Sequence, residues 1–425
     1  SKGTGMTTVY WLTRDLRLDD NPALHEAAKG SALVCVYMID PRWFEPGPFG
    51  WSPMGPHRWA FTRRSLVSLE AALNTLGHSL VIRWQRPEEG VPEVVNSLGA
   101  QRLVTSRPTA FDEMRQWQAI EAALPLVRCD LVETLTLFDE VGLPFRLDAL
   151  PETFSKFRRS IEKLGLTPVT PLNKPAALPA APSKFDADQQ QFGPGTGQSE
   201  TPFAGGEVSG VDHLARYLWK DQSILTYKVT RNALDDVSAS SKVSPWLSAG
   251  ALSVRRLAAE IARFEREVDR NESTYWLYFE LLWREYFQWY SRHRGRELFI
   301  SPGRQGKHSG STDAGEFERW LQNADTHALV RAGRVQLEST GYLSNRMRQI
   351  IASACIYDGR FDWRLGAAWF EHFLVDYDVA SNYGNWQYIA GVGADPRGGR
   401  VFNLDKQVSQ FDADGAYRKR WLKEP

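Results

Sequence analysis

Residues 340–388 read TGYLSNRMRQIIASACIYDGRFDWRLGAAWFEHFLVDYDVASNYGNWQY. Arginines, aspartates and asparagines alternate here with large aromatic side chains, at the starts and ends of segments with helical spacing. A flat ring with polar edges needs this mixture, because aromatic walls pack on its faces while charged and amide groups bond its edges. By composition alone, an aromatic helical core with ion pairs on its surface would explain the same residues. The order of the residues favours the ligand site.

The polar and aromatic groups of this stretch are candidate ligand contacts. Three of them share one predicted helix, two aspartates follow a predicted helix, and an asparagine and a tryptophan lie in the run at 382–386. The candidates are Asn345, Arg346, Arg348, Trp363, Asp376, Asp378, Asn382 and Trp386.

The length and composition of the chain indicate a protein of several domains. Its 425 residues are too many for one ordinary domain, so we expect two or three. Hydrophobic residues make up 42% and charged residues 24%, a balance typical of soluble globular proteins. No apolar run approaches the length of a transmembrane helix, so we expect no membrane association. The formal net charge of zero argues against a protein that coats nucleic acid by charge alone, but not against a local basic groove.

The cysteines and tryptophans narrow the class of ligand. The three cysteines, Cys35, Cys129 and Cys355, are far apart, which predicts buried thiols in a reducing, cytoplasmic setting. Because the cysteines do not cluster, we expect no zinc or iron–sulfur site and no other metal. Ten of the sixteen tryptophans follow residue 210. A domain so rich in tryptophan packs its rings on one another, on a cofactor or on bases.

The first third of the chain predicts a parallel sheet with helices on both faces. Between residues 7 and 133, continuous apolar runs alternate with amphipathic helical stretches, as in a Rossmann-like domain. No GxGxxG or P-loop motif is present, but an open sheet can still bind a ligand at the carboxyl ends of its strands. The apolar runs are at 9–12, 32–39, 79–84, 102–106 and 127–133.

The rest of the chain changes character twice. Residues 1–5 look like an expression scar, and 6–133 form the α/β domain. Residues 134–205 read as an inter-domain connector, with one amphipathic helix at 150–163 followed by a stretch rich in Pro, Ala, Gly and Gln. Residues 206–425 show helical spacing almost throughout, so we expect an all-α domain. The predicted fold is therefore α/β plus all-α.

The segment SASSKVSPWLSAGALS, residues 238–253, places hydroxyl groups and a lysine just before an apolar helix. The serines there are suited to cap that helix. Hydroxyls and a lysine at a helix start can also bind an anion. Both interpretations remain open from the residues alone.

The segment ELLWREYFQWY, residues 280–290, places Glu280, Trp283 and Arg284 on one face of a helix. A Glu–Arg pair at this spacing is usually a solvated ion pair, but the aromatic residues that follow make a solvated face less favoured. Residues 291–308 form the most basic segment of the chain and predict a path for phosphates.

Taken in order, these segments resemble the photolyase/cryptochrome family over most of the chain. The resemblance begins with WLTRDLRLDDNPAL at 11–24 and ends with FNLDKQVSQFDADGAYRKRWLKEP at 402–425. Three segments resemble the DASH cryptochrome branch in particular: LPETFSKFRRSIEK, NWQYIAGVGADPR and FNLDKQ. Gln349 and Tyr388 stand where the double-strand repair enzymes carry methionine and tryptophan.

The resemblance implies FAD as the cofactor. It implies that Arg284 lies against the flavin, that Arg348 pairs with Asp376 beside the ring, that Asp378 accepts from a ring N–H, and that Asn382 faces flavin N5. Glu280 and Asn345 belong to the same implied set. The residues implied to hold the diphosphate are Tyr227, Ser240, Ser241, Lys242, Val243 and Ser244.

The resemblance also implies a reaction, the light-driven repair of cyclobutane pyrimidine dimers by an electron from reduced flavin. Its implied partner is single-stranded or locally unpaired DNA, and we expect a monomer. Glu280, Trp283 and Asn345 would contact the lesion, with Gln349 and Tyr388 beside it. The alternative is a blue-light receptor that binds FAD and nucleic acid and signals without repair. A plain flavin oxidoreductase is a third class.

The chain departs from the family at two places. The motif TGYPxVDAxMR is replaced by DTHALVRAGR at 325–334, so we expect the packing behind the flavin to differ from that of the family. Trp386 and Trp363 match the family's electron-transfer tryptophans, but Gly310 lies near the expected third one. The branch usually carries a 5,10-methenyltetrahydrofolate antenna, for which Asp112 and Glu113 are competing ligands.

Overall fold

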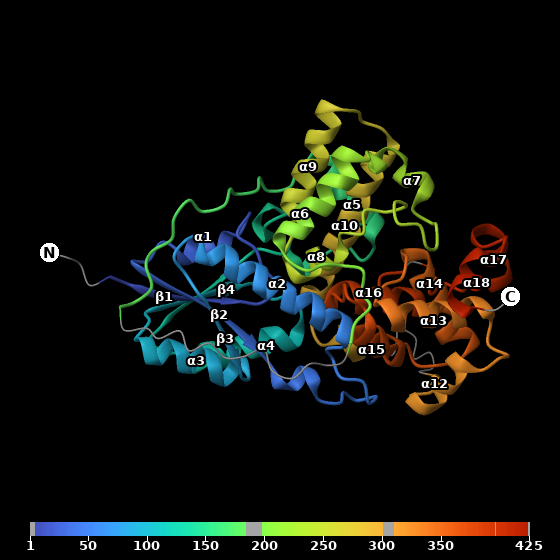
Figure 1. Ribbon diagram of the computed structural model, residues 1–425, viewed down its shortest axis with the longest axis horizontal. Helices are drawn as coiled ribbons and strands as arrows, with labels where there is room; N and C mark the ends of the chain where they lie inside the picture. The colour runs from blue at the N-terminus through green and yellow to red at the C-terminus, as the bar shows by residue number, and fades with distance from the viewer. Residues whose placement is uncertain (1–4, 184–197, 301–309, 396, 424–425) are drawn as a thin grey trace.

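The protein is described here from a computed structural model that covers residues 5–183, 198–300, 310–395 and 397–423. Most of the expected expression scar, part of the connector and residues 301–308 of the basic segment lie outside these described residues. Figure 1 shows an α/β half at one end of the molecule and a helical half at the other.

The N-terminal half is built on a five-stranded parallel sheet, as the apolar runs predict. The strand order is β3-β2-β1-β4-β5. Successive strands are added on one side of β1 up to β3 and on its other side from β4 onward, so the switch point lies between β1 and β4. Open α/β sheets bind ligands at this position. Two strands, β2 and β4, coincide with their predicted runs. The strands are β1 (Thr7–Leu12), β2 (Ala32–Ile39), β3 (Leu80–Trp84), β4 (Arg102–Ser106) and β5 (Arg128–Val132).

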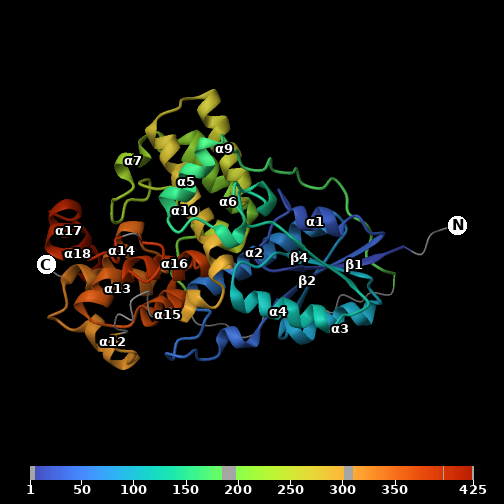
Figure 2. The same cartoon turned by 180° about the vertical axis from the view of Figure 1, so that it is seen from behind.

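Helices cover both faces of this sheet, because alternate strand residues point to opposite sides. Tyr10 and Leu12 pack in one core with α1 and α2, whereas Val9 and Trp11 pack in another with α3 and α4. Figure 2 shows α3 and α4 along the sheet from behind. The four helices are α1 (Pro22–Ala27), α2 (Pro56–Asn74), α3 (Pro87–Leu98) and α4 (Phe111–Ala122).

The described part of the connector contains one α-helix, α5 (Phe154–Lys163), which starts four residues later than the predicted range 150–163. The Thr153 side chain accepts from the Lys156 N–H and caps the helix, so the chain before it is not helical. Beyond α5, the described connector residues run along the α/β half, where the Leu33 N–H donates to the Ala180 carbonyl.

The C-terminal half is helical, as predicted. No strand occurs among the described residues after 206, where a single bridge joins Ser311 and Phe361. No helix within the described ranges is both long enough and apolar enough to cross a bilayer. The α-helices are α6 (Glu207–Ala215), α7 (Tyr227–Thr230), α8 (Ser244–Ala249), α9 (Val254–Glu267), α10 (Glu272–Arg294), α11 (Glu297–Ile300), α12 (Ala314–Gln322), α13 (Ala328–Thr340), α14 (Asn345–Ser353), α15 (Trp363–Phe373), α16 (Val379–Ala390), α17 (Leu404–Phe411) and α18 (Ala416–Leu422).

The unusual segment at 325–334 keeps its packing role with different residues. It starts α13, and Leu329, Val330 and Ala332 are fully buried in the core that also contains α14 and α15. Gly333 lies so close to α14 that a Cβ atom there would be 2.4 Å from Cδ1 of Ile351. Although the family motif is lost, α13 still packs closely against α14.

Candidate functional site

A cavity of about 110 Å³ lies between α14, the loop joining α15 to α16, and α16. We call it the ring cavity. Its lining brings together seven of the predicted residues, although they come from segments up to 41 positions apart. These residues are Asn345, Arg348, Gln349, Asp376, Asp378, Asn382 and Trp386.

Arg348 and Asp376 form the predicted pair at one side of the ring cavity. The two guanidinium nitrogens Nη1 and Nη2 donate to Oδ1 and Oδ2 at 2.9 and 2.7 Å. Burial alone would lower the pKa of Arg348, but the ion pair with Asp376 outweighs it and raises that pKa. The Ser244 hydroxyl donates to Asp376 Oδ2 at 2.6 Å, which joins the predicted diphosphate segment to this pair.

Asp378 lies at the start of α16 and remains charged although it is buried. Its Oδ1 accepts from the Ser381 N–H at 2.8 Å and from Gln288 Nε2 at 3.0 Å, and its Oδ2 accepts from Arg14. Burial would raise the pKa of Asp378, but Arg14 and Arg284 hold it well below the usual range for aspartate. The carboxylate is therefore available as an acceptor for a ligand N–H.

Asn382 is fixed on α16 by a hydrogen bond to the facing helix. Its Nδ2 donates to the Ala367 carbonyl of α15 at 3.0 Å, and the side chain is buried. One amide hydrogen is used in this way, so Asn382 can offer its second N–H or its carbonyl oxygen to a ligand in the ring cavity.

The residues around the ring cavity suit the ring of FAD. Trp386 supplies a flat wall, Arg348 a donor, Asp378 an acceptor and Asn382 an amide. In addition, the buried Gln288 Oε1 and Trp386 Nε1 have no hydrogen-bond partner in the described part of the chain. A ligand with polar edges would satisfy such atoms, whose burial otherwise costs free energy.

The predicted diphosphate residues lie outside the ring cavity. No serine side chain caps α8, whose N-cap is Val243, so the helix-capping interpretation of these serines is wrong. Instead, Lys242 Nζ donates to the Asp236 carbonyl at 2.9 Å and to Ser240 Oγ at 3.2 Å. Burial lowers the pKa of Lys242. The remaining members, Tyr227 and Ser241, are buried next to this segment.

The predicted substrate residues form a second group on α10 and α16. The rings of Trp283 and Tyr388 meet edge to face at 5.5 Å, and Phe154 of α5 stacks on Trp283 at 3.9 Å. Phe154 therefore covers one face of the predicted base-stacking wall. Glu280 pairs with Arg231 at 3.0 Å, and burial raises the pKa of Glu280.

Two expected positions differ from the prediction. Arg292, in the basic segment, has a side chain only 4% exposed that pairs with Glu133 at 2.6 Å, so it cannot bind phosphate at the surface. Arg284 donates to the Leu135 carbonyl at 2.8 Å and does not line the ring cavity, although its charge acts on Asp378. Both arginines join α10 to the chain that follows the sheet.

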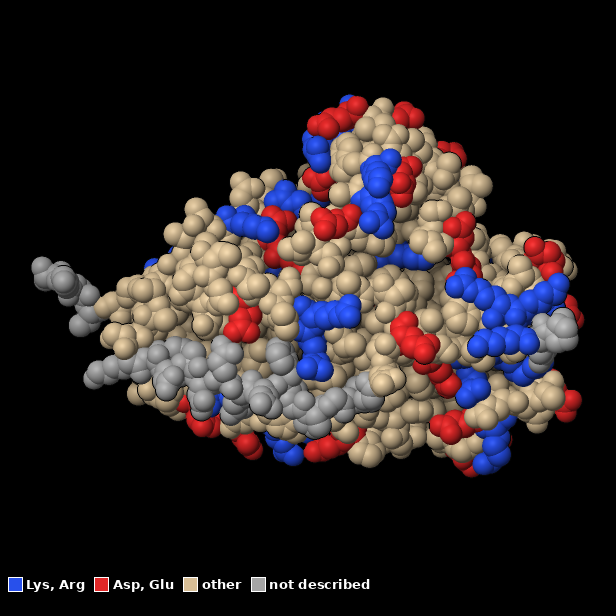
Figure 3. All heavy atoms as spheres, viewed as in Figure 1, with Lys and Arg blue, Asp and Glu red and all other residues tan. Residues whose placement is uncertain are grey.

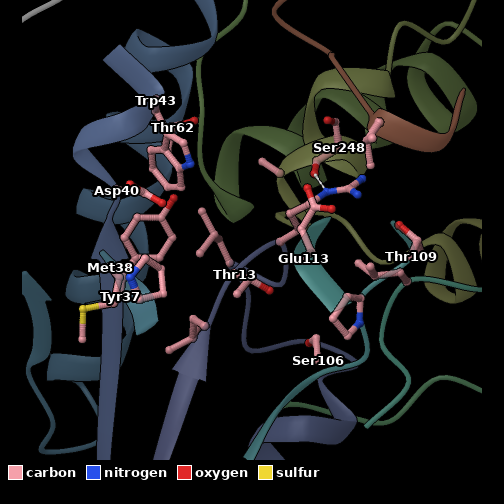
Figure 4. A pocket seen from close by; sticks show the side chains of 18 of the residues that line it. Thr13, Tyr37, Met38, Asp40, Trp43, Thr62, Ser106, Thr109, Glu113 and Ser248 are labelled. Carbon is pink, nitrogen blue, oxygen red and sulfur yellow. Dashed lines mark hydrogen bonds between the residues drawn. The ribbon is translucent and has the colours of Figure 1, made fainter. Parts of the chain in front are cut away.

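A second cavity, of about 220 Å³, opens at the carboxyl ends of the strands; we call it the sheet cavity. Figure 4 shows Tyr37, Asp40 and Trp43 on one wall, with Glu113 and Ser248 opposite. Of the two competing antenna ligands, Glu113 lines this cavity and Asp112 does not.

Sequence reasoning missed the residues that connect the two cavities. Arg14 lines the sheet cavity and reaches Asp378, and Tyr377 lines both cavities. Arg14 follows β1, where an open sheet binds ligands, and this was the only signal that could have identified it. Its partner lies 364 positions away, so local pattern could not reveal the pair.

Comparison with known proteins agrees with this architecture. The DNA photolyase family matches residues 8–179, and the FAD binding domain of DNA photolyase matches residues 276–425. The cryptochrome DASH of Idiomarina loihiensis is 41% identical over 416 residues, which cover 97% of this chain and 92% of that protein. The cryptochrome DASH of Arabidopsis thaliana is 36% identical, over 100% of this chain and 76% of its own.

Solved structures show the same likeness. The cryptochrome of Synechocystis sp. superposes with a TM-score of 0.94 at 35% identity, covering 100% of this chain and 90% of its own. A bacterial class III photolyase from Agrobacterium tumefaciens gives a TM-score of 0.82 at 26% identity, covering 100% and 88%. The fold, the ring cavity and these matches show that the chain belongs to the cryptochrome DASH branch of the photolyase/cryptochrome family and binds FAD in its helical domain.

Proposed function

We propose that this protein repairs cyclobutane pyrimidine dimers under blue or near-ultraviolet light, preferentially in single-stranded DNA. The observation that carries the proposal is the aromatic corner of Trp283 and Tyr388, with the half-buried Glu280 one turn before Trp283 on α10. Such a corner can stack a base and bond its carbonyl edge, which a flavin site alone does not need.

The chain's own residues have separate tasks in this reaction. FAD, when bound and reduced, supplies the electron that light transfers to the dimer. The Arg348–Asp376 pair and Asp378 hold the polar edges of the ring, and Trp386 closes one side against water. Asn382 places its amide where the redox state of the ring is tuned.

Glu280 is suited to bond the carbonyls of a pyrimidine. Burial raises the pKa of Glu280, which eases its protonation, and the protonated acid donates a hydrogen bond to a carbonyl oxygen. Arg231, which pairs with it, supplies a second donor at the same place. Asn345, the third residue proposed to contact the lesion, lines the ring cavity.

The preference for single strands follows from weaker binding of a dimer that has been flipped out of a duplex. Tyr388 is a smaller ring than tryptophan, and its hydroxyl is hydrogen-bonded to Arg400. Gln349 adds a polar amide. Flipping a dimer from a duplex costs a few kcal/mol, and a single strand avoids the unpairing part of that cost.

Charge on the surface is consistent with a nucleic-acid partner. Figure 3 shows lysine and arginine side chains gathered at the end of the helical half near the C-terminus, where α13 and α18 lie.

We also propose that the sheet cavity, with Glu113, holds an antenna pigment such as 5,10-methenyltetrahydrofolate. A cytoplasmic monomer completes the proposal.

The test compares Glu280→Ala with the parent on one dimer in a single-stranded and in a duplex oligonucleotide at equal salt. We expect the variant to keep its FAD and to repair at least about tenfold more slowly, because a hydrogen bond to the reacting carbonyls is lost. The parent should repair the single strand faster. Equal repair by variant and parent rejects the role of Glu280, and equal rates on both substrates reject the strand preference.

A receptor remains the second candidate, favoured by one observation. Phe154 covers a face of Trp283, which reduces the surface open to a base. Phe154→Ala should increase dimer repair if that ring limits access, and Phe145→Ala, which changes a phenylalanine that does not contact Trp283, is the matched control.

A further inference from the structure

Trp363, one of the two tryptophans proposed for electron transfer, lies against a tyrosine of α16. The rings of Trp363 and Tyr383 meet edge to face, with centroids 6.2 Å apart and planes at 81°. Among the residues that the structure describes, no other aromatic ring contacts the ring of Trp363. Tyr383 is therefore the next oxidisable group along any route that passes through Trp363.

The same two helices join Trp386 to this pair. Trp386 lines the ring cavity, and its indole lies directly on Gly366, where a Cβ atom would be 2.2 Å from the ring. Gly366 follows Trp363 by one turn of α15, and Tyr383 precedes Trp386 by one turn of α16. The three rings thus lead from the cavity along the α15–α16 contact to Tyr383, which is half-buried and so accessible to a reductant.

Neither alternative end of the route is supported by the structure. Gly310 lies against the backbone of the turn before α15, where a Cβ atom would be 2.2 Å from the Arg360 carbonyl oxygen, so no ring fits there. Trp320 contacts Phe361 and Phe317, at 5.5 and 6.3 Å, rather than Trp363.

Tyr383 has a proton acceptor, which oxidation of a phenol requires. Its hydroxyl donates to Glu371 Oε1 at 2.9 Å, and the Tyr377 hydroxyl donates to the same oxygen at 3.2 Å. Burial raises the pKa of Tyr383, so the phenol is neutral before oxidation. An oxidised phenol is a strong acid, and a carboxylate within hydrogen-bond distance takes its proton without diffusion.

We propose that Tyr383 is the terminal electron donor of this route and that Glu371 accepts its proton. Tyr383 gives one electron to the oxidised indole of Trp363 and its phenolic proton to the Glu371 carboxylate. The products are a neutral tyrosyl radical, a neutral tryptophan and a carboxylic acid. Light-excited oxidised flavin is the first electron acceptor, through Trp386, and an added thiol returns an electron and a proton to Tyr383. The inference rests on the proposed roles of Trp363 and Trp386.

The first test is radical spectroscopy on the FAD-loaded protein after a light flash. The parent, grown with ring-deuterated tyrosine, should show an electron paramagnetic resonance signal narrower than that of the unlabelled parent. Tyr383→Phe should lose this tyrosyl signal and photoreduce several-fold more slowly at low thiol. The matched control is Tyr357→Phe, which removes another half-buried hydroxyl of the same core, bonded to the Ile389 carbonyl at 2.7 Å. A full tyrosyl signal in Tyr383→Phe, or only a tryptophan radical in the parent, would overturn the assignment.

The second test separates the proton acceptor from a merely structural neighbour. Glu371→Gln keeps an oxygen that accepts the hydrogen bond but cannot take a proton. Burial raises the pKa of Glu371. Tyrosyl formation in the parent should slow as the pH falls through this raised pKa, because a protonated Glu371 cannot accept the proton. The variant should be slow and independent of pH. The groups that face Glu371 are Arg58 of α2, Asp112 and Glu113 of α4, Tyr377 and Tyr383. The same pH profile in both proteins would exclude Glu371 as the acceptor.

The two proposals fail separately. Repair by protein that was reduced with dithionite does not need the route to Tyr383. Absence of repair together with an intact tyrosyl signal therefore contradicts the proposed function alone. Repair without any tyrosyl signal contradicts the present inference alone.

Discussion

Two buried carboxylates of the helical half, Asp378 at the ring cavity and Glu285 at the junction with the connector, have pKa values shifted in opposite directions. Asp378 has Arg14 and Arg284 nearby, and its pKa falls although it is buried. Glu285 accepts from the backbone N–H groups of Leu137 and Phe138, and burial raises its pKa to about 7.

The difference distinguishes a carboxylate that can bind a ligand, Asp378, from one that only supports the fold, Glu285. Peptide N–H groups satisfy the oxygens of Glu285 but do not supply a full opposing charge, so desolvation dominates there. At the ring cavity, Arg14 and Arg284 keep Asp378 ionised, and a charged acceptor remains available to a ligand. We expect the two regions to respond differently to pH and to loss of a partner.

The largest effect should come from removing the partner of a ring-cavity carboxylate. Arg348→Met leaves Asp376, whose side chain is 2% exposed, as an unpaired buried charge. We expect the free energy of unfolding to fall by about 3–5 kcal/mol and FAD content to fall with it. Urea denaturation and the flavin absorption of the purified protein measure both.

Arg146→Met is the matched control for this variant. It breaks the Arg146–Asp148 pair, whose side chains are 85% and 67% exposed, and should change stability by less than about 1 kcal/mol. If the two variants were equally stable, the ring cavity would not depend on a buried ion pair.

The next effect is a pH dependence at the junction. Because the pKa of Glu285 is higher in the folded than in the unfolded chain, the folded state retains a proton that the unfolded state releases between about pH 4 and pH 7. Stability of the parent should therefore decline over this window. Glu285→Gln removes that decline, so the stability of the variant relative to the parent should rise by on the order of 3 kcal/mol between pH 4 and pH 8.

Denaturation at both pH values measures this change. A difference between variant and parent that stays constant with pH would show that Glu285 is not protonated in the folded protein. Asp378 acts in the opposite sense, since its lowered pKa stabilises the fold above about pH 4 and this contribution is lost in acid.

The smallest effect should come from the contact between the diphosphate segment and the ring cavity. Ser244→Ala removes the hydrogen bond to Asp376 but keeps the Arg348 pair. We expect a loss of about 1 kcal/mol of stability and a modest loss of FAD affinity. Fluorimetric titration of FAD into the stripped protein measures the affinity, with Ser238→Ala as an exposed control. If Ser244→Ala lowered the stability as much as Arg348→Met does, the Ser244 hydrogen bond would matter as much as the Arg348 ion pair, which would contradict this ranking.

The sequence predicted the sheet better than the connections around the site. The apolar runs at 32–39 and 102–106 coincide with β2 and β4, because continuous burial on both faces leaves an unbroken signal. The start of α5 was placed too early, since local spacing does not show that Thr153 caps the helix.

The ring cavity was foreseen because its residues lie within one stretch of sequence. What lay beyond prediction depends on contacts between distant segments: Arg14 with Asp378, Phe154 on Trp283, and Glu133 with Arg292. Each of these pairs is brought together by the packing of separate parts of the chain, which no local period encodes. The roles assigned to the site residues remain predictions.

The most direct test of the central claim is the fate of one cyclobutane dimer in a single-stranded oligonucleotide, incubated with the reduced, FAD-loaded protein in light and in darkness. Chromatography of the oligonucleotide counts the remaining dimers. The account predicts that dimers disappear over many turnovers in light and persist in darkness. Binding of the oligonucleotide and photoreduction of FAD without any loss of dimers in light would contradict it and favour the receptor.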